Sequence, residues 1–485
     1  MLWPFIFILM SPSNSHSLGG FSTSQRWSLI GGFQAAMSTP SAKHELKGWC
    51  ALALLSLALA GVFALLLAIS RVPNIQDVFP WPLQFFQKGL VIHVVFSFVV
   101  WFLSLLGALL TIATYRLADG TPKARVLGRV AVWLGLIAFI LLFIPGFRDH
   151  GEPSLNNYVP VIIDPLYYTG LCIFALSLAI QFIRFLVNIP SHNGAFDLVS
   201  QGIAVSGIIY LTALASFGIS LNLRWGTPID AAFNEDVFWA GGHVLQYLNT
   251  LLMLVAWYVL GGTAIARPLV DPRIFKAILG YFLVAAAALL SLSFIYDPIS
   301  FDGRTAFTWA QYGLAPPTLV FVGAAVINLL AYKQSGEPFN WQDPAFLSFV
   351  LSVIVFGLGG YLGLFVDGAD TRTPAHYHGV IGGVNLAFIG LFFCFLFPVL
   401  GSAAKSSRTV SILIWSYAVG QSFHSLGLFL AGGYGAPRKT AGHDQGIEDL
   451  GAEIGLYMMG VGAVVAVIGG VLFIWTASRL LHLMK

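Results

Sequence analysis

Long runs of apolar residues, separated by short polar loops, make up most of the chain. A helix that crosses a bilayer needs about 20 largely apolar residues, and runs of that length recur twelve times. We therefore predict an all-α polytopic membrane protein with twelve transmembrane helices. The predicted spans are 48–70, 86–115, 124–146, 165–187, 199–222, 236–264, 274–296, 308–332, 344–366, 375–401, 408–432 and 451–481.

The residues before the first span have a different character. Residues 1–36 are Ser-rich and loosely apolar without a clear charged n-region, and the first basic cluster runs from Lys43 to Lys47. A start at Met37 would give a conventional N-terminus, so we expect a mis-assigned start codon or a weak targeting segment. The predicted organisation is an N-terminal leader, 1–47, followed by one twelve-helix domain, 48–485.

Composition agrees with a membrane protein and excludes several other classes. Of 485 residues, 57% are hydrophobic and only 9% are charged, whereas a soluble domain carries roughly 25% charged residues. Cys50, Cys172 and Cys394 lie inside apolar runs at unrelated spacings, which fits neither a disulfide framework nor a CxxC metal site. A soluble enzyme, a DNA-binding protein and a disulfide scaffold are all excluded.

Loop charges predict the orientation, because Lys and Arg are retained on the cytoplasmic side of a membrane. With both termini inside, the inner segments hold fifteen cations and the outer loops hold eight. This asymmetry favours twelve spans with both ends cytoplasmic.

Five of the eleven histidines fall within predicted spans. His93, His243, His376 and His378 all lie within about two or three helical turns of the outer surface, and His424 lies at a similar depth in the eleventh span. Ionisable residues are costly to insert into a bilayer and are candidates for function. The alternative for each is a polar residue bonded to a neighbouring helix, but a shared depth favours metal or haem ligands.

Spacing within two spans refines this interpretation. His376 and His378 are separated by about 200° around a helix, so they can hold two different cofactors, with His93 closing one of them. His243 and Tyr247 are four residues apart and share a helix face. They are either two polar groups that share hydrogen bonds or a metal ligand beside a proton and electron donor.

These residues resemble the haem-copper oxidase superfamily through its catalytic subunit, the cytochrome c or quinol oxidase subunit I. The resemblance implies that His93 and His378 bind a low-spin haem and that His376 binds a high-spin haem. It implies that His243 is the helix-six copper ligand and that Tyr247 is the tyrosine of the family's HxxxY motif.

Two loops extend the resemblance, which covers nearly the whole chain after residue 48. Gly435-Ala-Pro-Arg438-Lys439 is similar to the family's GxPRR segment, so Arg438 and Lys439 are expected to contact haem propionates, with Lys in place of the second Arg. The segment from Asn157 to Tyr167 looks like the family's loop before helix four.

The seventh span departs from the family pattern. The family has two adjacent histidines there, but no His occurs between His243 and His376. One candidate copper ligand is therefore present and two are missing. Tyr296, Asp297 and His424 are the substitutes that we consider, and copper or non-haem iron at this position is poorly supported.

The leading hypothesis is a respiratory terminal oxidase subunit that reduces oxygen through two haems, with a subunit II-like partner and cytochrome c or quinol as electron donor. It would lie in a bacterial inner membrane. One alternative is a nitric oxide reductase of the same superfamily, for which Glu235 and Asp236 lie about two turns from His243. Another is a haem-binding electron-transfer protein that has lost the copper site. A transporter would leave the shared depth of the histidines unexplained.

Overall fold

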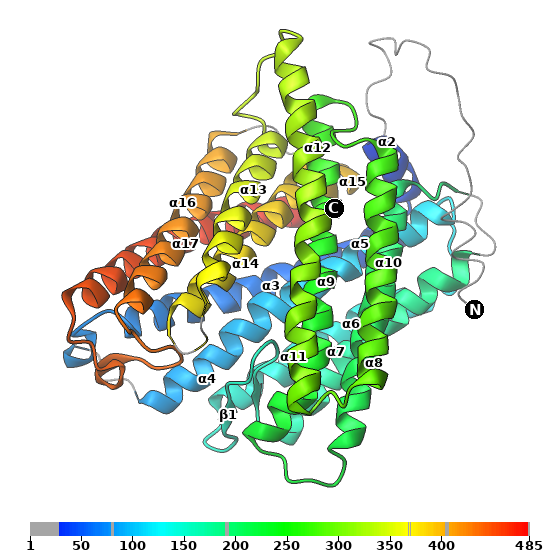
Figure 1. The fold of residues 1–485 in the computed structure, drawn as a ribbon. Coiled ribbons are helices and arrows are strands. Elements are labelled where there is room, and N and C mark those ends of the chain that lie inside the picture. Colours follow the sequence, from blue (N-terminus) through cyan, green and yellow to red (C-terminus); the bar gives the residue numbers. More distant parts are fainter. Residues whose placement is uncertain are drawn as a thin grey trace.

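The computed structural model describes residues 29–78, 82–189, 194–366, 368, 370–402 and 407–483. Most of the predicted leader, residues 1–28, therefore lies outside the described residues. The described part is a bundle of long helices with one short β-hairpin (Figure 1). Neighbours along the chain pack as antiparallel pairs, notably α6 (Arg125–Phe143) with α7 (Pro165–Asn188) and α8 (Leu198–Leu223) with α9 (Ala231–Ile265).

The remaining elements have the following bounds. The other long helices and the helical segments that extend them are α3 (Pro40–Ser70), α4 (Leu83–Val94), the π-helical turn η2 (Val95–Val100), α5 (Trp101–Leu117), α10 (Pro272–Ile295), α11 (Phe301–Ala310), α12 (Ala315–Gln334), α13 (Pro344–Leu362), α14 (Arg372–Leu391), the π-helical turn η7 (Phe392–Leu396), α15 (Phe397–Val399), α16 (Arg408–Gly433) and α17 (Leu450–Leu483). The short elements are α2 (Leu29–Ala36), β1 (Pro153–Ser154), β2 (Val161–Ile162) and the 3₁₀ turns η1 (Ile75–Asp77), η3 (Ile144–Phe147), η5 (Gln311–Leu314), η6 (Gly363–Phe365) and η8 (Gly442–Gln445).

Eleven helices in the described part of the chain are long and apolar enough to cross a membrane. They correspond to eleven of the twelve predicted spans. The remaining span, 408–432, is helix α16, which has 26 residues but includes several polar side chains. It packs closely against α17, so its crossing of the membrane remains a prediction that rests on length and packing.

Burial separates the central spans from the peripheral ones. In their most apolar stretches, 89% of the residues of Ala231–Ile265, 83% of Arg372–Val399 and 78% of Gln84–Leu117 are buried, against 61% or less in the other eight spans. These three spans carry His243, the His376–His378 pair and His93. The candidate ligands are thus on the helices that the rest of the bundle surrounds.

Asp-Pro pairs begin three of the spans. Asp164 accepts a hydrogen bond from the Leu166 amide at 2.7 Å, and Pro165 takes the first helical position of α7. Asp271 and Asp343 cap α10 and α13 in the same way. The carboxylate satisfies an amide that has no partner inside the helix, and proline cannot donate there anyway. Each loop therefore ends where its Asp-Pro pair lies.

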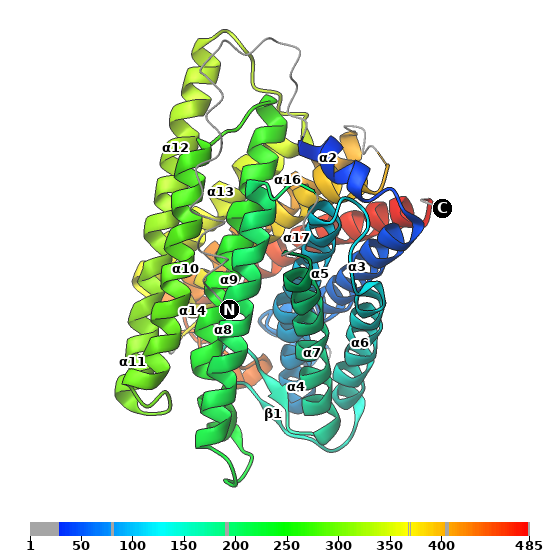
Figure 2. The ribbon, with the colours of Figure 1, turned by 90° about the vertical axis from the view of Figure 1, so that its right-hand side faces the viewer.

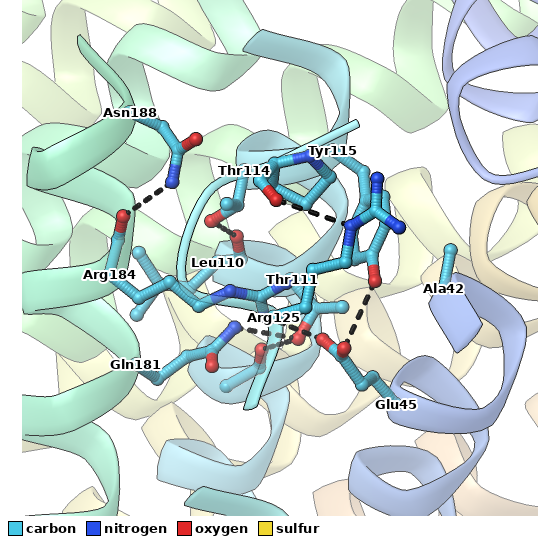
Figure 3. Close-up of polar contacts among 12 residues, drawn as sticks. Ala42, Glu45, Leu110, Thr111, Thr114, Tyr115, Arg125, Gln181, Arg184 and Asn188 are labelled. Carbon is cyan, nitrogen blue, oxygen red and sulfur yellow. Dashed lines mark hydrogen bonds and ion pairs between the residues drawn. The ribbon is translucent and has the colours of Figure 1, made fainter. Parts of the chain in front are cut away.

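The first span begins at Pro40 rather than near residue 48. Thr39 caps it, and the charged residues of its first turns are accommodated because Glu45 is buried against the end of α7. Arg184 Nη1 lies 2.5 Å from Glu45 Oε2, and the Tyr115 hydroxyl donates to Glu45 Oε1 at 3.0 Å. Figure 3 shows these side chains converging from α3, α5 and α7. The predicted span began later, because the charged residues from Lys43 to Lys47 were assigned to the preceding loop.

Two hydrogen-bonded chains fasten the central spans to one another. The Trp101 indole donates to Asn385 Oδ1 at 2.8 Å, and the Asn385 amide donates to the Tyr417 hydroxyl at 2.7 Å, which joins α5, α14 and α16. The Trp257 indole donates to Ser352 Oγ at 2.7 Å, joining α9 to α13. Side-chain hydrogen bonds of this kind hold helices together where lipid removes the hydrophobic driving force.

The hairpin of β1 and β2 lies toward one end of the bundle, with α11, while α2 lies toward the opposite end (Figures 1 and 2). Pro153 pairs with Ile162 and Ser154 with Val161 in antiparallel register. The loop between these strands therefore projects from a fixed base. It carries residues 155–160, part of the segment that resembles the family's loop before helix four.

Candidate functional site

The rings of His93, on α4, and His378, on α14, lie close together. Their centres are 6.4 Å apart and their planes are inclined by only 19°. Two imidazoles that bind one iron from opposite sides, through bonds of about 2 Å, have ring centres about 6 Å apart. The spacing of the pair is therefore the one expected for a bis-histidine haem site.

The orientation of the His93 ring is fixed by a backbone contact. Its Nδ1 lies 3.0 Å from the Ala60 carbonyl of α3. Because a carbonyl only accepts, Nδ1 carries the proton and Nε2 keeps its lone pair. The π-helical turn η2 begins two residues later, at Val95. Such turns frequently accompany functional residues in helices.

His376 contacts a different helix from His378, as the spacing predicts. Its Nδ1 lies 2.8 Å from the Gly359 carbonyl of α13, so Nδ1 donates there and Nε2 keeps its lone pair. A Cβ added at Gly359 or Gly379 would clash with the backbone of the other glycine's helix. The two glycines thus let α13 approach α14 closely enough to orient the His376 ring.

His424 lies beside the His93–His378 pair, away from His243. Its ring centre is 4.5 Å from that of His378 in an edge-to-face arrangement, and its Nδ1 lies 3.1 Å from the Met459 carbonyl of α17. His424 is one of the three residues that the sequence offers as substitute copper ligands. The structure instead makes it a neighbour of the predicted low-spin ligand.

His243 is buried on α9 with both ring nitrogens in hydrogen bonds. Nδ1 lies 2.8 Å from the Trp239 carbonyl and Nε2 lies 2.9 Å from the Tyr158 hydroxyl. The rings of Tyr158, Trp239 and Phe307 surround it, with centres 4.5, 4.9 and 6.1 Å away. This nitrogen, where the resemblance implies copper, accepts a hydrogen bond from a tyrosine of the hairpin loop.

Tyr247 shares its helix face with His243, but its hydroxyl lies elsewhere. It donates a short hydrogen bond to the Ala310 carbonyl, at the end of α11, and a Cβ at Gly313 would collide with it. The structure therefore does not bring the Tyr247 hydroxyl into a hydrogen bond with His243. The tyrosine bonded to His243 is Tyr158.

The substitute ligands at the end of the seventh span are exposed, whereas His243 is buried. The side chain of Tyr296 is 42% exposed at the end of α10. Asp297 is exposed and accepts a hydrogen bond from the Ile299 amide. In the described part of the chain, no three His, Cys, Asp or Glu side chains come together in a group suited to a metal ion. The donors present do not fit a three-ligand copper site.

Glu235 and Asp236, the acidic residues considered for a non-haem iron, are both engaged. Glu235 accepts hydrogen bonds from the Asn157 backbone amide at 3.0 Å and from the Asn157 side chain at 2.8 Å. Asp236 is fully buried and forms ion pairs with Arg224 and Arg304. Both carboxylates fasten neighbouring loops and helix ends to α9.

The loop with Arg438 and Lys439 lies against the start of α14. The Thr371 amide donates to the Ala436 carbonyl at 3.0 Å, and Asp370 forms a β-bridge with Pro437. Lys439 donates a short hydrogen bond to the Leu155 carbonyl of the hairpin loop. Burial lowers the pKa of Lys439, and the charge of Arg438 adds to this effect. The predicted propionate contacts are therefore close to the turn that carries His376 and His378.

Arg71 was missed as a candidate from the sequence. It follows α3, is only 9% exposed, and donates to Gln445 Oε1 at 3.1 Å and to the Pro437 carbonyl at 2.8 Å. Burial lowers its pKa to about 10, so it is charged at neutral pH. These partners are neutral, and the guanidinium suits an anionic group such as a haem propionate. In the sequence, Arg71 differs from most other cations only because it lies in a predicted outer loop, and such loops hold few cations.

Tyr158 was also missed, although its segment was recognised. Nothing in the spacing of Asn157-Tyr-Val-Pro160 indicates which side chain turns inward. The feature of the sequence that indicates this contact is the pair of glycines, Gly241 and Gly242, directly before His243. A Cβ at Gly242 would lie 2.5 Å from Tyr158 Cβ. A missing side chain next to a candidate ligand marks where another group approaches.

Most of the chain is similar to known proteins. Residues 46–472 match the profile of the family described as "Cytochrome C and Quinol oxidase polypeptide I". The uncharacterized protein RP382 of Rickettsia prowazekii (strain Madrid E) is 24% identical over 502 aligned residues, which cover 90% of this chain and 96% of the relative. An uncharacterized protein of Aquifex aeolicus (strain VF5) is 29% identical over 354 residues, covering 72% and 83%. Since the family match spans most of the chain, this protein belongs to the cytochrome c and quinol oxidase polypeptide I family.

Proposed function

We propose that this protein is the haem-binding redox subunit of a membrane oxidoreductase. In the proposal His93 and His378 bind a low-spin haem, and His376 binds a high-spin haem at which oxygen is reduced. The observation that carries it is the closeness of the His93 and His378 rings, which are nearly parallel and have a centre-to-centre spacing that matches one iron. Membership of the oxidase family supports the same assignment.

The protein groups around these histidines have definable roles in the proposal. Haem iron supplies the redox chemistry when it is bound. The Ala60 and Gly359 carbonyls orient His93 and His376 and keep each Nε2 unprotonated. Arg71, with Arg438 in the adjacent loop, offers positive charge to propionates at the outer ends of α3 and α14. Lys439 would have to leave the Leu155 carbonyl to do the same.

The proposed setting is a bacterial inner membrane with both termini cytoplasmic. The distribution of fifteen inner and eight outer cations supports this orientation. In the proposal electrons come from cytochrome c or quinol through a subunit II-like partner. The start at Met37 and the division at residue 47 likewise remain predictions.

A second candidate is a haem-binding electron-transfer protein without a second metal. The two hydrogen bonds on His243 favour it, because neither ring nitrogen is free. A nitric oxide reductase with Glu235 as an iron ligand is less favoured, since both Glu235 oxygens accept from Asn157. An oxygen reductase and an electron-transfer protein would both use the two haems, but only the reductase would consume oxygen.

The test uses the full chain purified from membranes in detergent. Reduced-minus-oxidised spectra and carbon monoxide binding are recorded, haem is counted per chain, and consumption of oxygen and of nitric oxide is measured. Two haems, one of which binds carbon monoxide, support the proposal, and oxygen consumption supports the oxidase role. Two haems with no consumption of either gas favour electron transfer. A chain without haem contradicts both.

A further inference from the structure

The Tyr158 hydroxyl lies 2.9 Å from His243 Nε2, the nitrogen to which the resemblance assigns the second metal. We propose that in this protein a tyrosine–histidine pair replaces the copper centre, with the Tyr158 hydroxyl donating to His243 Nε2. This inference deepens the proposed function, on which it rests, because it concerns the partner of the high-spin haem. It makes this subunit a haem protein that carries no copper on His243.

The protonation state of the pair follows from its partners. The Trp239 carbonyl accepts from Nδ1, so the proton of His243 lies on Nδ1. Nε2 then holds a lone pair, and the Tyr158 hydroxyl donates to it. Burial raises the pKa of Tyr158, as does the charge of Glu235. The phenol thus keeps its proton, and the pair is neutral in surroundings that disfavour charge.

The backbone of Tyr158 is held in an uncommon conformation that delivers this hydroxyl. Its φ is +68°, and the Val159 amide donates to the Asn157 carbonyl at 2.9 Å, which closes a γ-turn around Tyr158. For a bulky residue such a φ is a genuine outlier, and strained turns of this kind collect at functional sites. The surrounding contacts must therefore hold the turn in place.

Three contacts do so, from two different elements. Glu235, two turns before His243 on α9, binds Asn157 through its backbone and side-chain nitrogens. Lys439, from the loop after α16, donates to the Leu155 carbonyl. Gly242 has no side chain, so the Tyr158 ring packs directly on the α9 backbone. The helix that carries His243 thus also anchors the tyrosine that bonds to it.

A copper ion would gain little by displacing this arrangement. Metal ligands must present a free lone pair, and copper sites in proteins recruit several imidazole or thiolate donors. His243 offers one nitrogen, and its ring neighbours are Tyr158, Trp239 and Phe307. Binding through that single nitrogen would break the Tyr158 hydrogen bond and leave a buried hydroxyl without its partner, which is costly.

The first measurement is metal content. The full chain is produced with copper in the growth medium, and iron and copper per chain are measured by mass spectrometry for the native protein and for His243→Phe. We expect no copper that depends on His243. One copper ion per chain that is lost in His243→Phe but kept in His376→Ala would overturn the proposal.

The second measurement observes the pair itself. Nitrogen NMR of isotope-labelled histidine, with the His243 signals assigned by their loss in His243→Phe, reports tautomer and hydrogen bonding. We expect the Nδ1-protonated form and a shift of the Nε2 signal in Tyr158→Phe, which keeps the ring on Gly242. Tyr247→Phe is the matched control and should leave the signal unchanged, because its hydroxyl bonds to Ala310.

An Nε2 signal that does not respond to Tyr158→Phe would also overturn the proposal. Neither readout requires haem or turnover. If haem proves absent while the Tyr158–His243 coupling is present, the proposed function fails and the hydrogen-bonded pair stands. The two failures are therefore distinguishable.

Discussion

The imidazoles of His93 and His378 lie 6.4 Å apart, centre to centre, although 285 positions separate the two residues in the chain (378 − 93). The second and tenth predicted spans bring them together because the Trp101–Asn385 hydrogen bond ties the same two spans deeper in the bundle. The fold itself thus places the two imidazoles at the spacing that one haem iron requires.

Replacing one of these imidazoles tests the low-spin assignment. His378→Ala should remove the low-spin haem signal from reduced-minus-oxidised spectra, because one axial ligand is lost while His93 alone remains. The high-spin haem on His376 should persist, seen by carbon monoxide binding. His482→Ala, at an exposed position near the end of α17, is the matched control. An unchanged low-spin spectrum in His378→Ala would contradict the assignment.

Arg71 gives a second prediction about the same haem. A buried cation near a haem favours the reduced form, which carries one more negative charge. Arg71→Gln, which keeps a hydrogen-bonding side chain without the charge, should therefore lower the midpoint potential of the low-spin haem. Arg438→Gln tests whether the effect is specific, since Arg438 is less buried. Redox titration followed by absorbance measures both. A potential that stays constant in Arg71→Gln would remove Arg71 from the haem environment.

Gly242 and Gly218 form a matched pair for testing the Tyr158 contact. In Gly242→Ala the new Cβ meets the Tyr158 ring, so we expect a loss of roughly 1–3 kcal/mol of stability from overpacking and a weakened bond to His243. Gly218 has open space around it on α8, so Gly218→Ala should be neutral or gain up to about 1 kcal/mol from helix propensity. Thermal unfolding in detergent separates the two. Equal effects would mean that Tyr158 does not rest on Gly242.

The sequence predicts the membrane architecture well because each span is a local property. Length and apolarity alone locate Pro272–Ile295 to within two residues of the predicted 274–296. The start of α3 was missed because Glu45 reads as a surface charge until its partner Arg184, 139 residues away, is known. Pairing of distant charges is a tertiary property, and a hydropathy pattern contains no information about it.

The candidate site likewise contains residues that the sequence indicates and residues that only the structure reveals. His93, His376 and His378 were identified from depth and spacing, and the structure shows that the two α14 histidines contact different helices. Tyr158 was not identified, because an 85-residue separation and a γ-turn bring it to His243. Tyr247, four residues after His243 on the same helix face, was the predicted partner of that histidine. Its hydroxyl bonds to the Ala310 carbonyl of α11 instead. Helix periodicity predicts which residues share a face, and it does not predict what a loop inserts there.

The buried Glu45–Arg184 pair should be a large contributor to stability. Glu45→Gln leaves the fully buried Arg184 guanidinium uncompensated, and breaking a buried ion pair from one side costs roughly 3–5 kcal/mol. Asp77→Asn, which removes a pair with His443 on the exposed surface, should have little effect. Unfolding experiments in mixed micelles measure the loss of stability in Glu45→Gln and in Asp77→Asn. The double variant Glu45→Leu with Arg184→Met should recover most of the loss, and failure to recover would show that the charges have a further role.

Asp164 makes the outer end of α7 sensitive to acid. Although burial raises its pKa, the hydrogen bond from the Leu166 amide and the Arg148 guanidinium lower it, and the pKa lies below its usual value. A carboxyl group with a lowered folded-state pKa stabilises the protein above its unfolded-state pKa of about 3.9, and this contribution is lost as the pH falls toward the folded value.

Asp164→Asn isolates this effect, because Asn also caps helices well and can still accept from Leu166. We expect the variant to be less stable than the native protein at neutral pH, since the ion pair with Arg148 is lost. The difference should shrink as the pH is lowered below about 4, where the carboxyl group of the unfolded chain takes up a proton before that of the folded protein does. Thermal unfolding from neutral to acid pH measures it, and a difference that is independent of pH would show that the ionised carboxylate is not the stabilising form.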